Sequence, residues 1–453
     1  MWRKPRSDHD EDWEGDKGIS TTWPRKFLDR CVLYEVAKFV SKYADCEMID
    51  DDNLKILGKA GRNVCVRAIP DIGSDAVIRF SRPDVDAFPE ERLRNEVAVM
   101  RYIHDETSIP VPFIFHWGTQ EKSLDALGPV MVMEYMDHDR TMSDILRNPR
   151  FPDHFPPILD NNVYIEVLER MYGHLADIIL QLYMKSFLCV GSLDHVDDFT
   201  WEATKRPLSL QINDMALTSN LPESHLPSTI FYTASSYMEA LADLHMHNLI
   251  HQKHRVTSAN RFRQKFIARK LFQRLAQEKK LTDVTLEDAR HTLCCDSLHP
   301  TKVLLDGVDL AAVLGWEYTY TAPLEFSHAP PWWLLLEKPE LWPSGLEDWQ
   351  TQFDCRLQDF LRMLIECENR RQLPDDQRLS GLVKRNWEKG DFWVLYAARS
   401  STAFDEIYWR KIDEKFFGTT DDPDSWEERL LILSEEEKEE MEALVSANFK
   451  ETE

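Results

Sequence analysis

The chain of 453 residues is 43% hydrophobic, 11% aromatic and 29% charged, which is enough apolar material for a large core. This composition excludes an intrinsically disordered chain, and 15 glycines against 23 prolines exclude a collagen-like or glycine-rich protein. With 54 basic and 79 acidic residues the formal net charge is −25, so the chain should repel a phosphate backbone. Nucleic acid is therefore not expected as a main partner.

The cysteines and the N-terminal segment favour an intracellular protein. The eight cysteines are scattered without a Cys-x-x-Cys pair, which is typical of reduced thiols rather than of a disulfide framework. The N-terminal segment MWRKPRSDHDEDWEGDKG lacks the apolar region of a secretory signal, and the apolar runs of the chain are too short to cross a membrane. We expect a cytoplasmic protein with no membrane partner.

The first part of the chain is expected to form a small lobe. Residues 1–25 lack periodicity and are expected to form a flexible arm, and helical spacing follows over 27–43. The segments LKILG, VCVRAI and AVIRF then alternate as short strands of an antiparallel sheet, with turn residues between them. A helix is expected over 91–104, followed by the buried strand GPVMVMEYM. These elements would form an N-lobe over 26–136, including the helix that precedes the sheet.

The next part, residues 137–417, is expected to form a larger and mainly helical C-lobe. Apolar residues at helical spacing predict a long amphipathic helix over 167–182. Residues 201–230 show little periodicity and are expected to form a loop, before a second helical block over 231–282. The segments KVLLDG and VDLAAVLGWE predict a hairpin that turns at Asp306-Gly307.

Two charged segments lie in the second half of the chain. Ten Lys or Arg and one Glu fall within 253–280. The simplest interpretation is a solvated helix face that pairs with acidic residues elsewhere, and an anion-binding role is the alternative. Residues 418–453 form an acidic C-terminal segment, expected to be a short helix followed by a glutamate-rich helix or tail.

Seven segments, taken in order, resemble the fungal branch of the aminoglycoside phosphotransferase family in the protein-kinase-like superfamily. They are KAGRN, EVAVMRYIHDETSIPVP, GPVMVMEYM, DSLHPTKVLLD, LGWEYTYTAPLEF, APPWWLLL and DFWVLYAARSSTAFDEIYWRKIDEKFFG, within 54–418. The resemblance implies an α+β bilobal protein-kinase-like fold, with a small antiparallel-sheet N-lobe and a larger helical C-lobe. It also implies that ATP binds between the lobes and that Mg²⁺ is held there by oxygen ligands.

The catalytic loop departs from the family pattern His-x-Asp-Leu-x-Pro-x-Asn. Leu298 and Pro300 set the register of CDSLHPTK, which places Ser297 at the catalytic aspartate and Lys302 at the metal-binding asparagine. Gly315, in LGWE, stands where the second metal-binding carboxylate is expected. A hydroxyl, an ammonium and a glycine supply neither the base nor the metal ligands. These positions predict a pseudoenzyme and argue against bound Mg²⁺.

An active enzyme with rearranged residues is the alternative. Asp296 lies one residue before the expected aspartate and could supply a carboxylate if the loop 295–317 were shifted, and Glu317 could hold a metal ion. The chain would then be an ATP-dependent kinase of a small hydroxyl compound. Lys302 could also replace a metal by neutralising phosphate charge, which would allow nucleotide to bind without Mg²⁺. The residues name no substrate, and a protein partner stays open.

The N-lobe positions of the family are better kept. Gly61 matches the phosphate-side turn, and Arg79 stands in place of the phosphate-pairing lysine, with Glu96 as its partner on the helix. Glu134 to Met136 match the hinge whose backbone would contact adenine. Each position has a structural alternative: an ordinary hairpin turn for Gly61, an ion pair without a ligand for Arg79 and Glu96, and packing for the hinge residues.

Two other features have simpler interpretations. His291, Cys294, Cys295 and His299 resemble a zinc set but lack a standard ligand spacing, so they are expected to be loop and strand residues. The segment APPWWLLL is expected to anchor the core of the C-lobe, although an exposed part of it could bind a partner.

Overall fold

The structure is a computed structural model. It describes residues 23–44, 51–58, 62–82, 85–119, 124, 127–150, 157–197, 200–219, 221–252, 256, 258–419 and 426–449. Residues 1–22 of the expected arm, Gly61, and residues 253–255 and 257 of the basic segment therefore lie outside the described residues.

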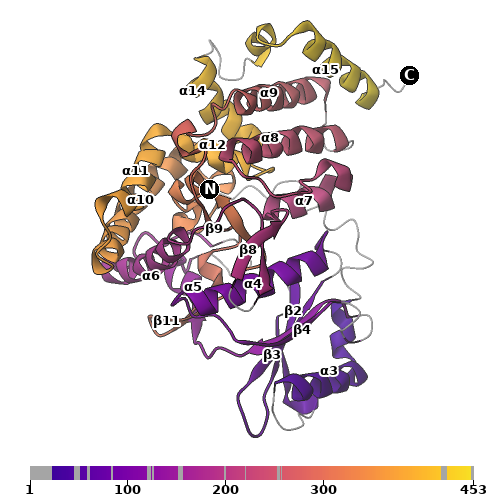
Figure 1. Cartoon of the computed structure of the whole chain (residues 1–453), viewed down its shortest axis with the longest axis vertical. Helices are drawn as coiled ribbons and strands as arrows, with labels where there is room; N and C mark the ends of the chain where they lie inside the picture. Colours follow the sequence, from indigo (N-terminus) through magenta and orange to yellow (C-terminus); the bar gives the residue numbers. More distant parts are fainter. Residues whose placement is uncertain are drawn as a thin grey trace.

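The N-lobe, at the bottom of Figure 1, is a five-stranded antiparallel sheet with a helix on each face. Its strands are β1 (Leu54–Gly58), β2 (Asn63–Ala68), β3 (Ala76–Ser81), β4 (Ile114–Gly118) and β5 (Val130–Glu134), in the order β1-β2-β3-β5-β4. Its helices are α3 (Arg30–Tyr43), preceded by a short 3₁₀ turn (Pro24–Leu28), and α4 (Pro89–Glu106). The helices expected over 27–43 and 91–104 are confirmed.

The alternation of side chains along β3 decides which residues meet each helix. Ile78 and Phe80 pack in the core beneath α3, whereas Val77 packs in the core that includes α4. Arg79 has the same parity as Val77, so it points toward α4. The sheet therefore presents one arginine to the helix that separates it from the C-lobe.

The C-lobe, above the N-lobe in Figure 1, is mainly helical. Its longer helices are α6 (Ile165–Tyr183), α7 (Leu210–Ser219), α8 (Ala234–His251), α9 (Ala259–Gln277), α10 (Leu346–Arg370), α11 (Ser380–Lys389) and α12 (Asp391–Ala398). Shorter helical segments are α5 (Met142–Leu146), α13 (Phe404–Ile407), a π-helical turn (Tyr408–Ile412) and α14 (Asp413–Phe417). The core pairs α6 with α10 and α8 with α9. The two-lobed α+β fold expected from the sequence is confirmed.

Short strands carry the loop that the sequence singles out. The strands are β6 (Arg140–Thr141), β9 (His291–Cys295), β10 (Val303–Asp306), β11 (Asp309–Val313) and β12 (Thr319–Pro323). The predicted hairpin is the pair β10–β11, and β9 pairs antiparallel with β12. Residues 296–302 connect β9 to β10, and residues 314–318 connect β11 to β12, so both segments run between the same two strand pairs and lie close together.

The prediction of a loop over 201–230 is wrong. That region contains strand β8 (Thr200–Lys205), which pairs with β7 (Ser192–Asp197), and then helix α7. Most residues of this hairpin are exposed or half-buried, so its strands lack the apolar alternation that predicts a strand. Helix α7 packs into a small separate core through Ile212 and Met215, which leaves only a short apolar signal.

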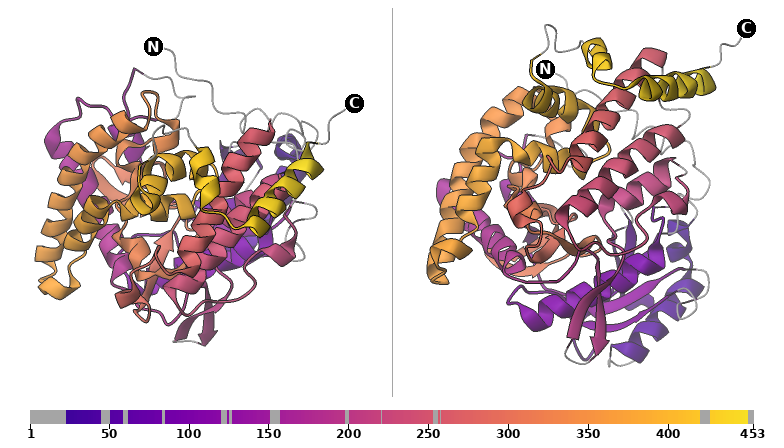
Figure 2. Two further views of the ribbon diagram at one scale, coloured as in Figure 1. Left: turned by 90° about the horizontal axis from the view of Figure 1, so that it is seen from above. Right: turned by 45° about the horizontal axis from the view of Figure 1, so that its top comes forward.

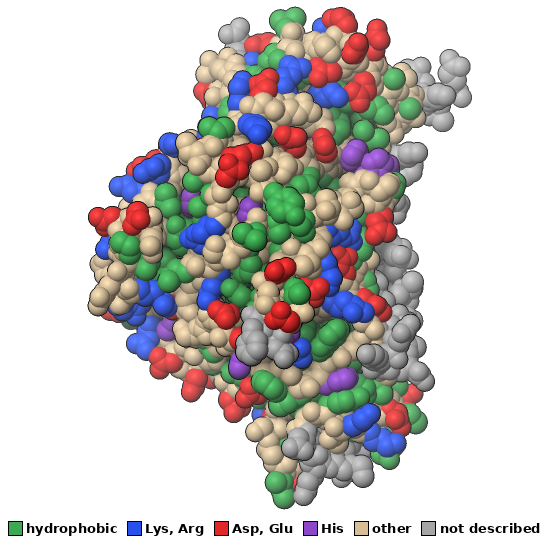
Figure 3. Space-filling model, in the orientation of Figure 1, with side chains coloured by type: hydrophobic (Ala, Val, Ile, Leu, Met, Phe, Trp, Pro, Cys, Tyr) green, Lys and Arg blue, Asp and Glu red, His purple; other side chains and the backbone are tan. Residues whose placement is uncertain are grey.

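The basic helix and the glutamate-rich helix pair with each other. Helix α15 (Glu435–Asn448) lies beside α9 in both views of Figure 2. Three ion pairs join them: Arg263–Glu442 at 2.6 Å, and Lys270–Glu440 and Arg274–Glu437 at 2.7 Å each. Red and blue side chains accordingly alternate at the top of the molecule in Figure 3. These three basic residues pair with acidic residues elsewhere, as the simplest interpretation predicts, whereas Arg269 of the same helix is buried and pairs with Asp405.

None of the helices in the described part of the chain is long and apolar enough to span a bilayer.

Candidate functional site

The junction of the two lobes contains a buried ion pair between strand β3 and helix α4. The guanidinium of Arg79 donates two hydrogen bonds to Glu96, one from Nη1 to Oε1 at 2.7 Å and one from Nη2 to Oε2. The two side chains are only 8% and 1% exposed. This bidentate arrangement is the strong form of the interaction between an arginine and a carboxylate, and it occupies both terminal nitrogens of Arg79.

Glu317 of the C-lobe joins this ion pair. Its Oε1 lies 3.8 Å from Nη1 of Arg79 and 3.7 Å from Nη1 of Arg92 on α4. Asn63 of β2 donates to the same oxygen at 3.4 Å. Arg92 in turn pairs with the buried Asp86 at 2.9 Å. The residue that the sequence offers as a metal ligand is therefore held by two arginines and an amide of the N-lobe.

Charged neighbours keep Glu317 and Arg79 ionised. Burial opposes ionisation of Glu317, but the cations Arg79, Arg92 and Lys302 outweigh it and lower its pKa to about 2. Burial likewise opposes the charge on Arg79, yet Glu96 and then Glu317 raise the pKa of its guanidinium above the ordinary value. Glu317 and Arg79 are thus held in their charged forms, whereas burial raises the pKa of Glu96 above its ordinary value despite the neighbouring Arg79.

The charges around the junction balance. Its cations are Arg62, Arg79, Arg92 and Lys302, and its carboxylates are Asp86, Asp214, Glu96 and Glu317. Arg62 pairs with Asp214 of α7 at 2.9 Å and lies 3.7 Å from Asp86. Among the described residues the cations match these carboxylates in number, which leaves no excess negative charge among them to attract a divalent cation.

Two of the positions that the resemblance assigns to metal binding lie against each other. Gly315 has φ +83°, and a Cβ added to it would lie 3.0 Å from Cγ of Lys302 and 3.3 Å from its Cδ. The backbone N–H of Leu314 donates to the carbonyl of Lys302 at 2.8 Å, which holds the two segments together. The stem of Lys302 thus occupies the space beside the missing carboxylate.

These residues do not fit Mg²⁺. Gly315 offers no oxygen from a side chain, and the exposed Lys302 places an ammonium beside it. This ammonium forms no ion pair or hydrogen bond with any residue that the structure describes. Ser297 is half-buried in the same loop. Among the described residues, no group of three or more His, Cys, Asp or Glu side chains is arranged to hold a metal ion. His291, Cys294 and Cys295 belong to strand β9, and His299 lies in the loop that follows it.

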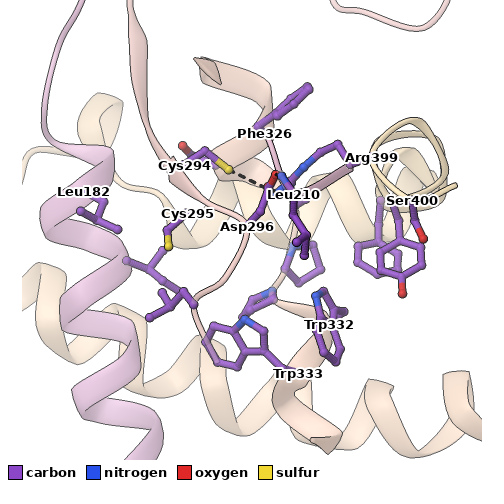
Figure 4. A pocket seen from close by; sticks show the side chains of 18 of the residues that line it. Leu182, Leu210, Cys294, Cys295, Asp296, Phe326, Trp332, Trp333, Arg399 and Ser400 are labelled. Atoms are coloured by element: carbon purple, nitrogen blue, oxygen red, sulfur yellow. Dashed lines mark hydrogen bonds and ion pairs between the residues drawn. The ribbon is translucent and has the colours of Figure 1, made fainter. Parts of the chain in front are cut away.

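Asp296 is directed into the C-lobe and is already bound there. Its Oδ1 accepts a hydrogen bond from Nη2 of Arg399 at 2.6 Å, and its Oδ2 accepts one from the backbone N–H of Leu210 at 3.2 Å. The side chain is 8% exposed. Figure 4 shows Asp296 and Arg399 meeting at one side of a pocket. Both oxygens of Asp296 are therefore engaged within the C-lobe.

Two of the hinge residues, Glu134 and Met136, form hydrogen bonds within the protein. The backbone N–H of Glu134 donates to the carbonyl of Phe113 at 2.8 Å, and its carboxylate accepts from the N–H of Phe113 at 3.3 Å. The carbonyl of Met136 lies 2.8 Å from Nδ1 of His138. Both side chains are half-buried, so the packing alternative accounts for them as well as adenine contact does.

The sequence-based candidates lack several charged residues of these clusters: Arg62, Asp86, Arg92, Asp214 and Arg399. Arg92 stands four residues before Glu96 on α4, and this spacing places the two on one helix face. The helical spacing could therefore have predicted that Arg92 lies near Glu96. Asp86 and Arg399 belong to no motif and reach the clusters only through the tertiary fold.

No protein-family model and no curated protein matches the sequence. Among solved structures, the chain is similar to the streptomycin–ATP–APH(2")-IIa ternary complex, at 10% identity and a TM-score of 0.43, over 84% of this chain and 98% of that one. It is similar to an ethanolamine kinase of Plasmodium vivax at 12% identity and a TM-score of 0.44, over 95% of each chain. It is also similar to ADP-bound aminoglycoside phosphotransferase APH(2'')-Ib at 9% identity and a TM-score of 0.41, over 84% and 98%. Because these identities and scores are low, the proposals below depend on the geometry of this chain.

Proposed function

We propose that this chain is a pseudoenzyme of the aminoglycoside phosphotransferase type, which binds a ligand or a partner without transferring a phosphoryl group. Phosphoryl transfer needs a carboxylate to orient the attacking hydroxyl and metal ions to neutralise the phosphates. The positions that the resemblance assigns to these roles hold Ser297, Lys302 and Gly315. None of these side chains is a carboxylate.

The observation that carries the proposal is the contact between Lys302 and Gly315. A carboxylate at position 315 would require a Cβ within 3.0 Å of Cγ of Lys302. The two substitutions therefore fit each other: the lysine fills the space that the glycine leaves, and its ammonium stands where a cation would be bound. ATP, if it binds, would meet this ammonium and would not require Mg²⁺.

The alternative of an active kinase depends on Asp296. Both oxygens of this carboxylate accept hydrogen bonds within the C-lobe, one of them from the Arg399 guanidinium at 2.6 Å. To act as a base it would have to leave a buried ion pair, which costs several kcal/mol. The geometry therefore supports the pseudoenzyme better than the active kinase.

The proposal is tested by following ATP consumption with Mg²⁺ in the wild type and in Asp296→Asn, a substitution that retains the size of the side chain. Asp306→Asn is the matched control, since Asp306 is an exposed aspartate of the β10–β11 hairpin. We expect no turnover above the protein-free rate in any of the three. Turnover that depends on Mg²⁺ and is lost only in Asp296→Asn would replace the proposal by the active kinase.

A further inference from the structure

A cavity of about 180 Å³ lies inside the C-lobe, apart from the ion-pair cluster between the lobes. It is enclosed by α6, β9, the segment 326–333 and the end of α12. Asp296 and Leu298 line it, whereas Ser297, between them, does not. The cavity therefore lies on the other side of the loop from the position that the resemblance assigns to the catalytic aspartate.

Among the described residues, the charged groups that line the cavity leave one ammonium without an anionic partner. Asp296, Arg399 and Lys338 are its three charged lining residues. Asp296 and Arg399 neutralise each other at 2.6 Å, and Asp296 also accepts from the N–H of Leu210. The Lys338 ammonium forms neither an ion pair nor a hydrogen bond with any described residue. An anionic ligand would satisfy this ammonium, whereas a cationic one would have to compete with Arg399 for Asp296.

The remaining wall is aromatic and apolar. Trp332 is half-buried, and its ring lies 5.9 Å from Nζ of Lys338. Trp333 is buried beside it, and Figure 4 shows both indoles at the end of the pocket opposite Asp296 and Arg399. The APPWWLLL segment thus anchors the core, as the sequence predicts, and also presents both indoles to the cavity. A flat ring beside Trp332 would bring a carboxylate on that ring within reach of Lys338.

The volume limits the size of the ligand. A cavity of about 150 Å³ in another protein admits one benzene molecule, so the space of about 180 Å³ here suits a single ring with a small substituent. The pocket is partly open to solvent, so this volume limits the part of a ligand that lies inside it.

We propose that this cavity binds a small aromatic carboxylate, with its ring against Trp332 and its carboxylate on the Lys338 ammonium. The inference extends the proposed function by naming a ligand class. The two can fail separately, because binding here is measured without nucleotide, whereas the proposed function fails only if ATP is turned over.

Titration calorimetry with three compounds of one size tests the inference. Benzoate should bind the wild type at least about tenfold more tightly than neutral benzamide, because one charge-assisted hydrogen bond is gained. Benzylamine, which carries the opposite charge, should bind more weakly than benzamide. Lys338→Met should weaken benzoate by about tenfold and leave benzamide unchanged. Lys384→Met, at an exposed lysine of α11 outside the cavity, is the control and should bind all three compounds as the wild type does.

Trp332→Leu supplies a second variant, which should weaken benzoate and benzamide alike because it removes the ring from the wall. Three results would overturn the inference. The first is no saturable binding of benzoate up to about 10 mM, which is the weakest dissociation constant expected for a ligand of this size. The others are equal affinities for benzoate and benzylamine, and an affinity for benzoate that Lys338→Met leaves unchanged.

Discussion

Replacing Arg79 by methionine tests whether the buried ion pair at the lobe junction is part of the fold. Arg79 is 8% exposed and faces two carboxylates, Glu96 at 2.7 Å and Glu317 at 3.8 Å. Without Arg79, Glu96 is left 1% exposed and without its bidentate partner. Removing one partner of such a pair typically costs about 3–5 kcal/mol. If Arg79 served only to bind phosphate and did not stabilise the fold, its replacement would lower the free energy of unfolding by about 1 kcal/mol or less.

The assay is urea denaturation of the protein without ligand, with fluorescence and circular dichroism required to give coincident transitions. Arg79→Met should lower the free energy of unfolding by about 3–5 kcal/mol. The double variant Arg79→Met/Glu96→Leu should recover most of this loss, because an apolar pair of similar volume replaces the ion pair at little cost. Arg94→Met is the matched control, since Arg94 lies on α4, the helix that carries Glu96, and its side chain is 53% exposed.

A loss below about 1 kcal/mol for Arg79→Met would refute the structural role. So would a double variant no more stable than the single one, because Glu96 would then not be the group that requires the arginine. Either result would favour the alternative interpretation, in which Arg79 contacts nucleotide as the resemblance suggests.

Three further predictions concern other parts of the chain. Gly315→Ala should destabilise the protein by about 1–2 kcal/mol in thermal or urea unfolding, because φ at this position is +83° and the new Cβ would lie 3.0 Å from Cγ of Lys302; an unchanged stability would show that neither the backbone conformation nor this contact constrains the position. Burial raises the pKa of Glu325 from 4.5 to about 7, so the folded state favours its protonated form, and the stability this contributes is lost as the pH rises through about 7. Glu325→Gln should therefore match the wild type closely at pH 5 and exceed it at pH 8 by up to about 3 kcal/mol, whereas an equal effect at both pH values would show that the carboxyl is not perturbed. Changing Glu437, Glu440 and Glu442 together to glutamine should speed hydrogen exchange in α15 without altering global unfolding, because each ion pair with α9 contributes about 0.2–1 kcal/mol; unchanged exchange would mean that apolar packing alone holds the helix.

Local patterns predict the elements that carry the site. The alternation in AVIRF, the helical spacing before His104 and the turn at Asp306-Gly307 each appear as expected, in β3, α4 and the β10–β11 hairpin. These elements bury one clear apolar face, so periodicity reveals them. The β7–β8 hairpin was missed because its strands are largely exposed.

The partners of the site residues could not be predicted in the same way. Asp296 and Arg399 are 103 residues apart, and Asn63 and Glu317 are 254 apart. Such contacts depend on how the lobes and helices are placed in space, which no local pattern records. For this reason the sequence left the role of Asp296 open, and it balanced a structural Arg79 against one that contacts nucleotide.

Thermal unfolding of the wild type with and without ATP, once in Mg²⁺ and once in EDTA, measures whether nucleotide binding requires a metal ion. A ligand at about 100 times its dissociation constant stabilises the folded state by about 2.7 kcal/mol. Because Lys302 and Gly315 replace the metal ligands, the account predicts the same change in midpoint in Mg²⁺ and in EDTA. A midpoint that rises with ATP only when Mg²⁺ is present would contradict the account, since a metal would then be bound with the nucleotide.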